Sequence, residues 1–141
     1  TINANEWSHI AVTFGEKTIK VYVNGVEKGS STTNVPSSVN FGIAHNDEQG
    51  TRITRCFWVG YSYEHARYFP GMMSELRIWN RVLTADELAN ATRRYGVDPK
   101  SEGLVTYWKC DEGQGDVIKD HTSYRNDLAS DGLKWEPVSL P

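Results

Sequence analysis

Alternation of apolar and polar side chains with a period of two dominates the first part of this chain and restricts it to β structure. Ile10, Val12 and Phe14 share one side of the first stretch, and residues 18–23 alternate in the same way. This period matches a β-strand, in which successive side chains point to opposite faces of the sheet. The two stretches therefore predict a hairpin, and Asn24-Gly25 predicts the next tight turn.

The same alternation returns later in the chain, between polar segments rich in Gly, Pro, Asn and Asp. One helix interrupts it: Thr84-x-x-Glu87 is a capping box, which predicts a short peripheral helix near residues 84–94. Many short strands with a single helix favour an all-β fold, an antiparallel β-sandwich. The length of 141 residues suits one domain, residues 1–141.

Composition and charge exclude several classes of protein. Hydrophobic residues make up 38% of the chain, which is enough for one core. No apolar run is long enough for a transmembrane helix, which needs about 20 residues, and any export signal is expected to lie outside this chain. A net charge of −3 does not favour nucleic acid as a partner. The spacing of the cysteines and histidines does not indicate a structural zinc site.

Three stretches together resemble the laminin G-like domains of the concanavalin A-like lectin/glucanase family. They are WSHIAVTF with VYVNG (residues 7–14 and 21–25), FPGMMSELRIWNRVLTADE (residues 69–87), and GLVTYWKCDEG (residues 103–113) continued by Lys119-Asp120-His121-Thr122 and Asn126-Asp127. The resemblance implies a jelly-roll β-sandwich. Ser74 and Cys110 depart from it, because the family usually has Asp and Phe there. The third stretch normally opens such a domain, so we expect a fragment or C-terminal module of a larger protein.

An enzyme is not expected. Glucanases that share this resemblance carry a Glu-x-Asp-x-Glu strand that points its acids into one groove, and this chain has no such triplet. Asp111 and Glu112 are adjacent, so in an extended strand they point to opposite faces and do not form a shared site.

Sugar binding is the leading hypothesis, because aromatic rings stack on sugar C–H patches while polar groups hold the hydroxyls. Strand alternation predicts an outer face that carries Tyr22, Trp58 and Trp79 beside Arg77. The alternative is that loops or further strands cover these rings. A second set of candidate ligand-binding residues lies on the loop 62–69, where recognition is often found: Tyr63, His65, Arg67 and Tyr68.

Calcium is implied by the resemblance alone. Carried over by position, the ligands are Asp120, Asn126, Asp127 and Glu75. The alternative is that these Asp and Asn residues only form turns. No other cofactor is expected.

Alternation places Cys56 and Cys110 on opposite sides of their sheets, so two free, buried thiols are expected rather than a disulfide. The resemblance to bacterial surface proteins suggests a non-catalytic, lectin-like module of a secreted or cell-surface protein, with a glycan as its partner. The alternatives are a protein–protein interaction or adhesion module and a purely structural accessory domain.

Overall fold

The computed structural model describes most of the chain and divides it into two compact units. One unit joins residues 1–35 to residues 73–141, and the other comprises residues 36–72. The described residues are 2–35, 45–46, 52–53, 59–60, 68–90, 94–130 and 132–141. Four of the predicted ligand-binding residues and one cysteine lie outside them: Trp58, Tyr63, His65, Arg67 and Cys56.

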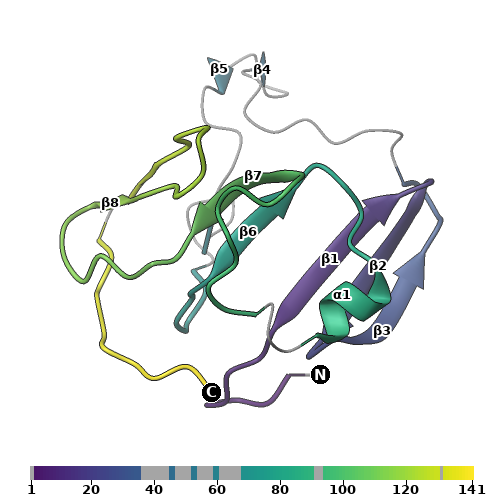
Figure 1. The fold of residues 1–141 in the computed structure, drawn as a ribbon, viewed down its shortest axis with the longest axis horizontal. Coiled ribbons are helices and arrows are strands. Elements are labelled where there is room, and N and C mark those ends of the chain that lie inside the picture. Colours follow the sequence, from purple (N-terminus) through teal and green to yellow (C-terminus); the bar gives the residue numbers. More distant parts are fainter. Residues whose placement is uncertain are drawn as a thin grey trace. The chain divides into compact units, whose positions relative to one another are not determined.

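The predicted hairpin and the turn after it are both present in the first unit. Strands β1 (Ile10–Gly15), β2 (Thr18–Val23) and β3 (Val26–Ser31) form one antiparallel sheet in that order (Figure 1). Each connection has two residues with positive φ, 50° and 57° at Glu16-Lys17 and 51° and 80° at Asn24-Gly25. Left-handed residues at both turn positions give the backbone twist that flanking strands require.

The remaining strands form two-stranded antiparallel sheets. In the first unit, β6 pairs with β7 and β8 pairs with β9, whereas β4 pairs with β5 in the second unit. Helix α1 (Ala85–Ala89) follows β6 along the chain (Figure 1). The bounds of the strands are β4 (His45–Asn46), β5 (Arg52–Ile53), β6 (Leu76–Trp79), β7 (Leu104–Trp108), β8 (Val117–Ile118) and β9 (Leu128–Ala129).

The capping box predicted at the start of α1 is confirmed. The Thr84 hydroxyl accepts a hydrogen bond from the Glu87 N–H at 3.2 Å, and the Glu87 carboxylate accepts one from the Thr84 N–H at 2.9 Å. The helix is shorter than predicted, because Asn90 already has an extended backbone, with φ −69° and ψ 102°.

Helix α1 packs against the turn between β2 and β3. A Cβ atom at Gly25 would lie 2.7 Å from the Cα of Ala89 and 2.9 Å from the backbone oxygen of Leu88. Leu88 itself is buried. Glycine at position 25 therefore serves two requirements at once, a φ of +80° and close approach of the helix backbone.

The assignment of the inner face of the first sheet was wrong. Val12, on the apolar side opposite the predicted outer face, is 63% exposed, whereas its neighbour Thr13 is 9% exposed. Tyr22, expected on the outer face as a ligand-binding residue, is buried at 4% exposure and is opposite Ala11 in the register. Alternation sorts residues into two faces, but both faces here carry apolar side chains, so the pattern did not determine which face is covered.

Strand β7 is buried on both faces. Leu104, Thr106, Tyr107 and Trp108 are all nearly inaccessible to solvent, and Tyr107 is completely buried. Neighbouring residues of one strand can be buried together only where both faces of the strand are covered. Strand β7 is therefore a fixed part of the core, and the loops that follow it are attached to it.

A buried carboxylate fixes the loop after β8 to β7. The Asp120 side chain is completely buried and accepts four hydrogen bonds, each 2.9 Å long. The donors are the backbone N–H groups of Tyr107, Thr122 and Asn126 and the Thr122 hydroxyl. Burial alone raises the pKa of Asp120, but these hydrogen bonds outweigh burial and hold the pKa below its ordinary value of 3.8.

We expect Gly25→Ala to lower the free energy of unfolding by about 3 kcal/mol, because it adds backbone strain and a collision with α1. The matched control is Gly115→Ala, since Gly115 has a φ of +81° and no atom within 4 Å of a built Cβ. The control should lose only about 1 kcal/mol from backbone strain. Urea unfolding of the three proteins measures both values, and equal losses would contradict the packing of α1 on this turn.

We expect Asp120→Asn to lower the free energy of unfolding by about 3–5 kcal/mol, because an amide NH₂ replaces an acceptor that faces N–H donors. The pKa of Asp120 is lower in the folded protein than the unfolded value of 3.8, so the ionised carboxylate stabilises the fold above about pH 4. This stabilisation is lost as the pH falls through the pKa of the folded state. The difference between wild type and variant should therefore shrink below about pH 4.

Chemical unfolding at pH 7 and at pH 3 measures this difference. The control is Asp116→Asn, an exposed carboxylate on the preceding segment, which should change stability by less than about 0.5 kcal/mol. A loss at Asp120 no larger than that of the control would show that the carboxylate is not structurally required.

Candidate functional site

An open cleft of about 510 Å³ lies between the connector that precedes β7 and the loop that follows β8. Its walls carry both charge signs, hydroxyl groups and an imidazole ring. The lining residues are Asp98, Pro99, Lys100, His121, Thr122, Ser123 and Arg125. These groups can donate and accept hydrogen bonds, which suits a polar ligand rather than an apolar one.

Both walls of the cleft are held by hydrogen bonds. In the connector, the Asp98 carboxylate accepts a hydrogen bond from the Lys100 N–H at 2.9 Å. In the loop, the His121 N–H donates to the Tyr107 carbonyl at 2.9 Å, and the Thr122 Oγ1 atom lies 3.1 Å from the Val105 carbonyl oxygen. The loop wall is thus attached directly to β7.

An exposed aromatic side chain lies next to this cleft in the sequence. Tyr124 is 60% exposed and stands between the lining residues Ser123 and Arg125. A wide, rigid ring with one polar edge can stack on a ligand while its hydroxyl reaches water. The sequence motifs did not point to Tyr124 as a candidate ligand-binding residue, because this loop was expected to be a calcium site.

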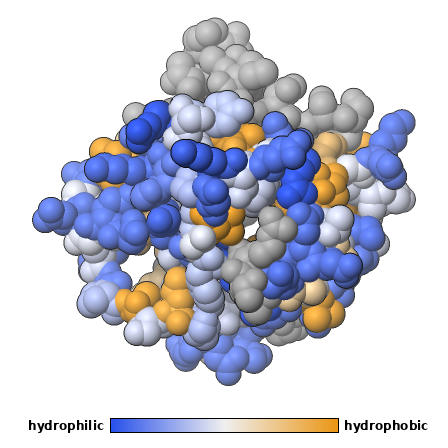
Figure 2. Space-filling view, in the orientation of Figure 1, coloured by the Kyte–Doolittle hydropathy of each residue, from blue (hydrophilic) through white to orange (hydrophobic). Residues whose placement is uncertain are grey.

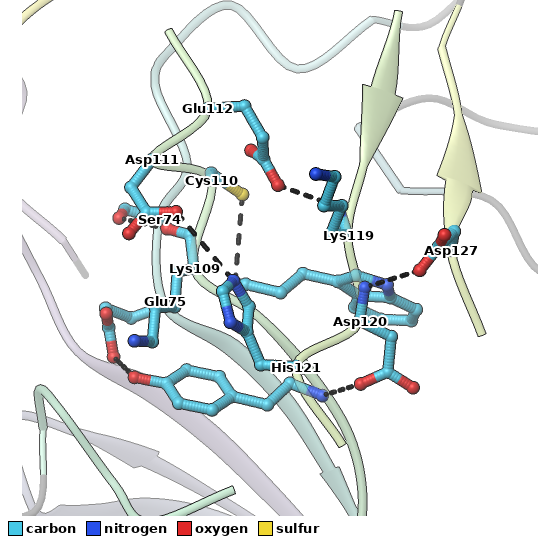
Figure 3. Close-up of polar contacts among 12 residues, drawn as sticks. Ser74, Glu75, Lys109, Cys110, Asp111, Glu112, Lys119, Asp120, His121 and Asp127 are labelled. Atoms are coloured by element: carbon cyan, nitrogen blue, oxygen red, sulfur yellow. Dashed lines mark hydrogen bonds and ion pairs between the residues drawn. The ribbon is translucent and has the colours of Figure 1, made fainter. Parts of the chain in front are cut away.

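A second group of polar side chains gathers where β7 ends. One ligand atom each from Asp111, Glu112 and His121 lies within 4.8 Å of the other two (Figure 3). The expectation that the two adjacent acids face opposite sides was wrong. Cys110, just before them, has a φ of 61°, and residues 111–113 are not in a strand, so the alternation ends there.

Cys110 is a half-buried free thiol beside these acids. Burial, together with the negative charges of Glu112, Asp111 and Glu75, raises the pKa of the Cys110 thiol to about 12. The thiol is therefore protonated at neutral pH and is a poor nucleophile. The acids create a negative potential at this end of β7.

Arg77 and Trp79, expected together on an open outer face, have separate environments. The half-buried Arg77 guanidinium donates to the Arg94 carbonyl at 2.7 Å and lies over the Tyr107 ring, 5.6 Å from its centroid. Trp79 is half-buried with Arg81 over its ring at 5.2 Å. The register of β6 shifts between Ile78 and Trp79, which interrupts the alternation.

Of the residues predicted on the loop 62–69, the structure describes Tyr68, whose side chain is 70% exposed. It belongs to the second unit, residues 36–72. Tyr68 is thus accessible, and its role in binding stays a prediction.

The four residues carried over as calcium ligands are not gathered around one point. The carboxylate of Asp120 is occupied by its four donors, and Asp127 accepts a hydrogen bond from the Asp120 N–H at 2.8 Å (Figure 3). Glu75 accepts a hydrogen bond from the Tyr107 hydroxyl at 2.5 Å. Asp120 binds the backbone N–H of Tyr107, at the other end of that residue. The Asn126 amide donates to the Thr106 hydroxyl. These residues do not fit a calcium site built on Asp120, and calcium binding stays a prediction of the resemblance.

The face of the molecule drawn in Figure 2 is largely polar. Figure 2 shows mostly hydrophilic side chains on the drawn face, with hydrophobic side chains in small separate patches. In the described ranges, no helix combines the length and the apolar character needed to cross a membrane.

Comparisons with known proteins agree with this architecture. The family model of the concanavalin A-like lectin/glucanases superfamily, Laminin_G_3, matches residues 1–89. A crystal structure from Bacteroides ovatus, titled as that of a "putative carbohydrate binding protein", is 30% identical with a TM-score of 0.67. The match covers 99% of this chain and 38% of that chain.

A further crystal structure, of an S-layer domain-containing protein from Clostridium thermocellum, is 26% identical with a TM-score of 0.43. That match covers 67% of this chain and 42% of that chain. A search of the curated proteins gave no match. The family match confirms the resemblance found in the sequence motifs. This all-β, antiparallel jelly-roll chain belongs to the concanavalin A-like lectin/glucanases superfamily.

Proposed function

We propose that this chain is a non-catalytic carbohydrate-binding module of a secreted or cell-surface protein. The observation that carries the proposal is the structural match, over 99% of this chain, to a protein titled as a putative carbohydrate binding protein. The chain spans only 38% of that relative, so the activity of the whole protein is a separate question.

We place the glycan in the cleft between the 98–100 connector and the 121–125 loop. Arg125, Lys100 and Asp98 supply charged donors and acceptors at its rim, and the buried hydrogen bonds of Asp120 hold the loop in shape. Tyr124 would stack on the apolar face of a sugar ring, and the polar groups would distinguish hydroxyl positions. One open cleft should bind with a Kd on the order of 1 mM to 1 μM.

The chemistry of the chain supports binding rather than hydrolysis. The Glu-x-Asp-x-Glu strand of the glucanases is not found in the sequence. Glycoside hydrolysis needs two carboxyl groups that flank the scissile bond. Of the cleft-lining residues, Asp98 is the single carboxylate, and its oxygen Oδ1 already accepts the Lys100 N–H.

A protein-interaction or adhesion role is the second candidate, and one specific observation favours it. The outward face of β1 and β2 exposes Ile10, Val12 and Val21 at 49%, 63% and 38%. Adjacent exposed aliphatic side chains are typical of surfaces that contact another protein. In that case glycans would not bind, and binding to a protein partner would depend on Val12.

We expect Tyr124→Ala to weaken glycan binding about tenfold, because it removes the stacking ring. A glycan array identifies a ligand of the wild-type protein, and isothermal titration calorimetry with that ligand measures the Kd. Tyr124 is exposed, so the melting temperature should stay within a few degrees of wild type, which separates lost binding from lost folding.

Tyr68→Ala and Trp58→Ala are the matched aromatic variants on the second unit. Unchanged affinity in both, with loss in Tyr124→Ala, places the sugar in the cleft. Loss in Tyr68→Ala or Trp58→Ala alone moves the site to the second unit. An array without any bound glycan rejects carbohydrate binding altogether.

A further inference from the structure

Three metal-ligating side chains converge beside the glycan cleft, and one of them, His121, also lines it. Asp111 and Glu112 come directly after β7, and His121 comes after β8, so the pairing of Tyr107 with His121 brings the two segments together. The Asp111 carboxylate and the His121 Nε2 atom are 3.8 Å apart. This distance is too long for a hydrogen bond but suits two ligands of one cation.

Two polar atoms of these side chains are buried without a hydrogen bond. Among the described residues, neither Nε2 of His121 nor Oε2 of Glu112 has a hydrogen-bond partner, although both atoms are inaccessible to solvent. Buried polar atoms in proteins are nearly always paired, so each exception needs an explanation. One of these atoms is a nitrogen and the other is a carboxylate oxygen of the same cluster. A cation bound by both would explain why neither forms a hydrogen bond.

We propose that Asp111, Glu112 and His121 form a binding site for a divalent transition metal ion, with zinc as the ion that fits best. Zinc takes imidazole nitrogen together with carboxylate oxygen, commonly from three protein residues with water in the fourth position. Calcium takes oxygen ligands, so the His121 nitrogen disfavours it here.

The geometry requires only a small closure. Ligand atoms about 2.1 Å from a tetrahedral ion lie about 3.4 Å apart. Here the Asp111 and His121 atoms are 3.8 Å apart, and all three ligand atoms lie within 4.8 Å of one another. The Asp111 side chain is 63% exposed and can turn toward the ion. The other carboxylate oxygen of Glu112 accepts the Lys119 N–H at 2.7 Å, which orients Glu112 and leaves Oε2 available (Figure 3).

The local charge also favours a cation. Within the described part of the chain, no lysine or arginine forms an ion pair with Asp111 or Glu112. The Lys109 ammonium instead lies over the Tyr107 ring, 5.7 Å from its centroid. Neither acid is therefore neutralised by a lysine or arginine in this part of the chain, which favours a bound metal ion.

The experiment is a titration of the metal-free protein with Zn²⁺ alone, followed by calorimetry and by the melting temperature. We expect one ion per chain and a higher melting temperature when Zn²⁺ is bound. Asp111→Asn should weaken Zn²⁺ binding about tenfold and His121→Gln on the order of 100-fold, because each removes one ligand. Ca²⁺ should bind far more weakly than Zn²⁺.

Two controls keep the result specific. Asp116→Asn removes a nearby acid outside the cluster, and Cys110→Ser removes the adjacent thiol, so both should retain the wild-type affinity for Zn²⁺. If His121→Gln does not fold, Glu112→Gln and Asp111→Asn still test the site. Glu112→Gln keeps an acceptor for the Lys119 N–H, and Asp111→Asn changes an exposed side chain, so both should fold.

The proposal is overturned by any of three results: no stoichiometric Zn²⁺ binding, binding unchanged in Asp111→Asn and Glu112→Gln, or binding lost in Cys110→Ser alone. The first result would leave the contact between His121 and Asp111 without a metal-binding role. Metal binding is measured without any glycan, so its outcome is independent of the proposed function.

Discussion

The Asp120 carboxylate is the interaction on which the loops at the end of β7 depend. Its four hydrogen bonds join the backbone of Tyr107, in the middle of the buried strand, to Thr122 and Asn126 in the following loop. A buried carboxylate without such donors would be strongly destabilising, so charge and donors have to occur together. The wall of the cleft and the position of His121 both follow from this one contact, because His121 and Thr122 come directly after Asp120.

The local features of the fold were predictable because each depends on a few neighbouring residues. Asn24-Gly25 forms the left-handed two-residue turn that its sequence indicates, and Thr84 and Glu87 form the predicted capping box. Family membership was predictable from motifs with fixed spacing. The covered face of the first sheet was not, since Val12 and Tyr22 both suit a core and only tertiary packing distinguishes them.

The candidate functional residues were harder to predict because they lie where strand alternation ends. Cys110 adopts a left-handed backbone, a conformation that cysteine rarely takes. No feature of the sequence therefore indicated that Asp111 and Glu112 would turn to the same side. The register shift before Trp79 had the same effect on β6. Tyr124 could have been noticed, because an aromatic residue within a polar loop is a common sign of recognition.

The distribution of charge links these observations. A carboxylate that accepts three N–H groups and a hydroxyl has its negative charge stabilised by the protein itself, so Asp120 has no need of a cation. A few residues away, Glu112 accepts a single backbone N–H, that of Lys119, and Asp111 lies near the His121 imidazole instead of among backbone donors. The calcium set implied by the family motif and the cluster found in the structure thus differ in how many donors stabilise the charge of the acid. By this criterion the proposed cation site is beside His121 rather than at Asp120.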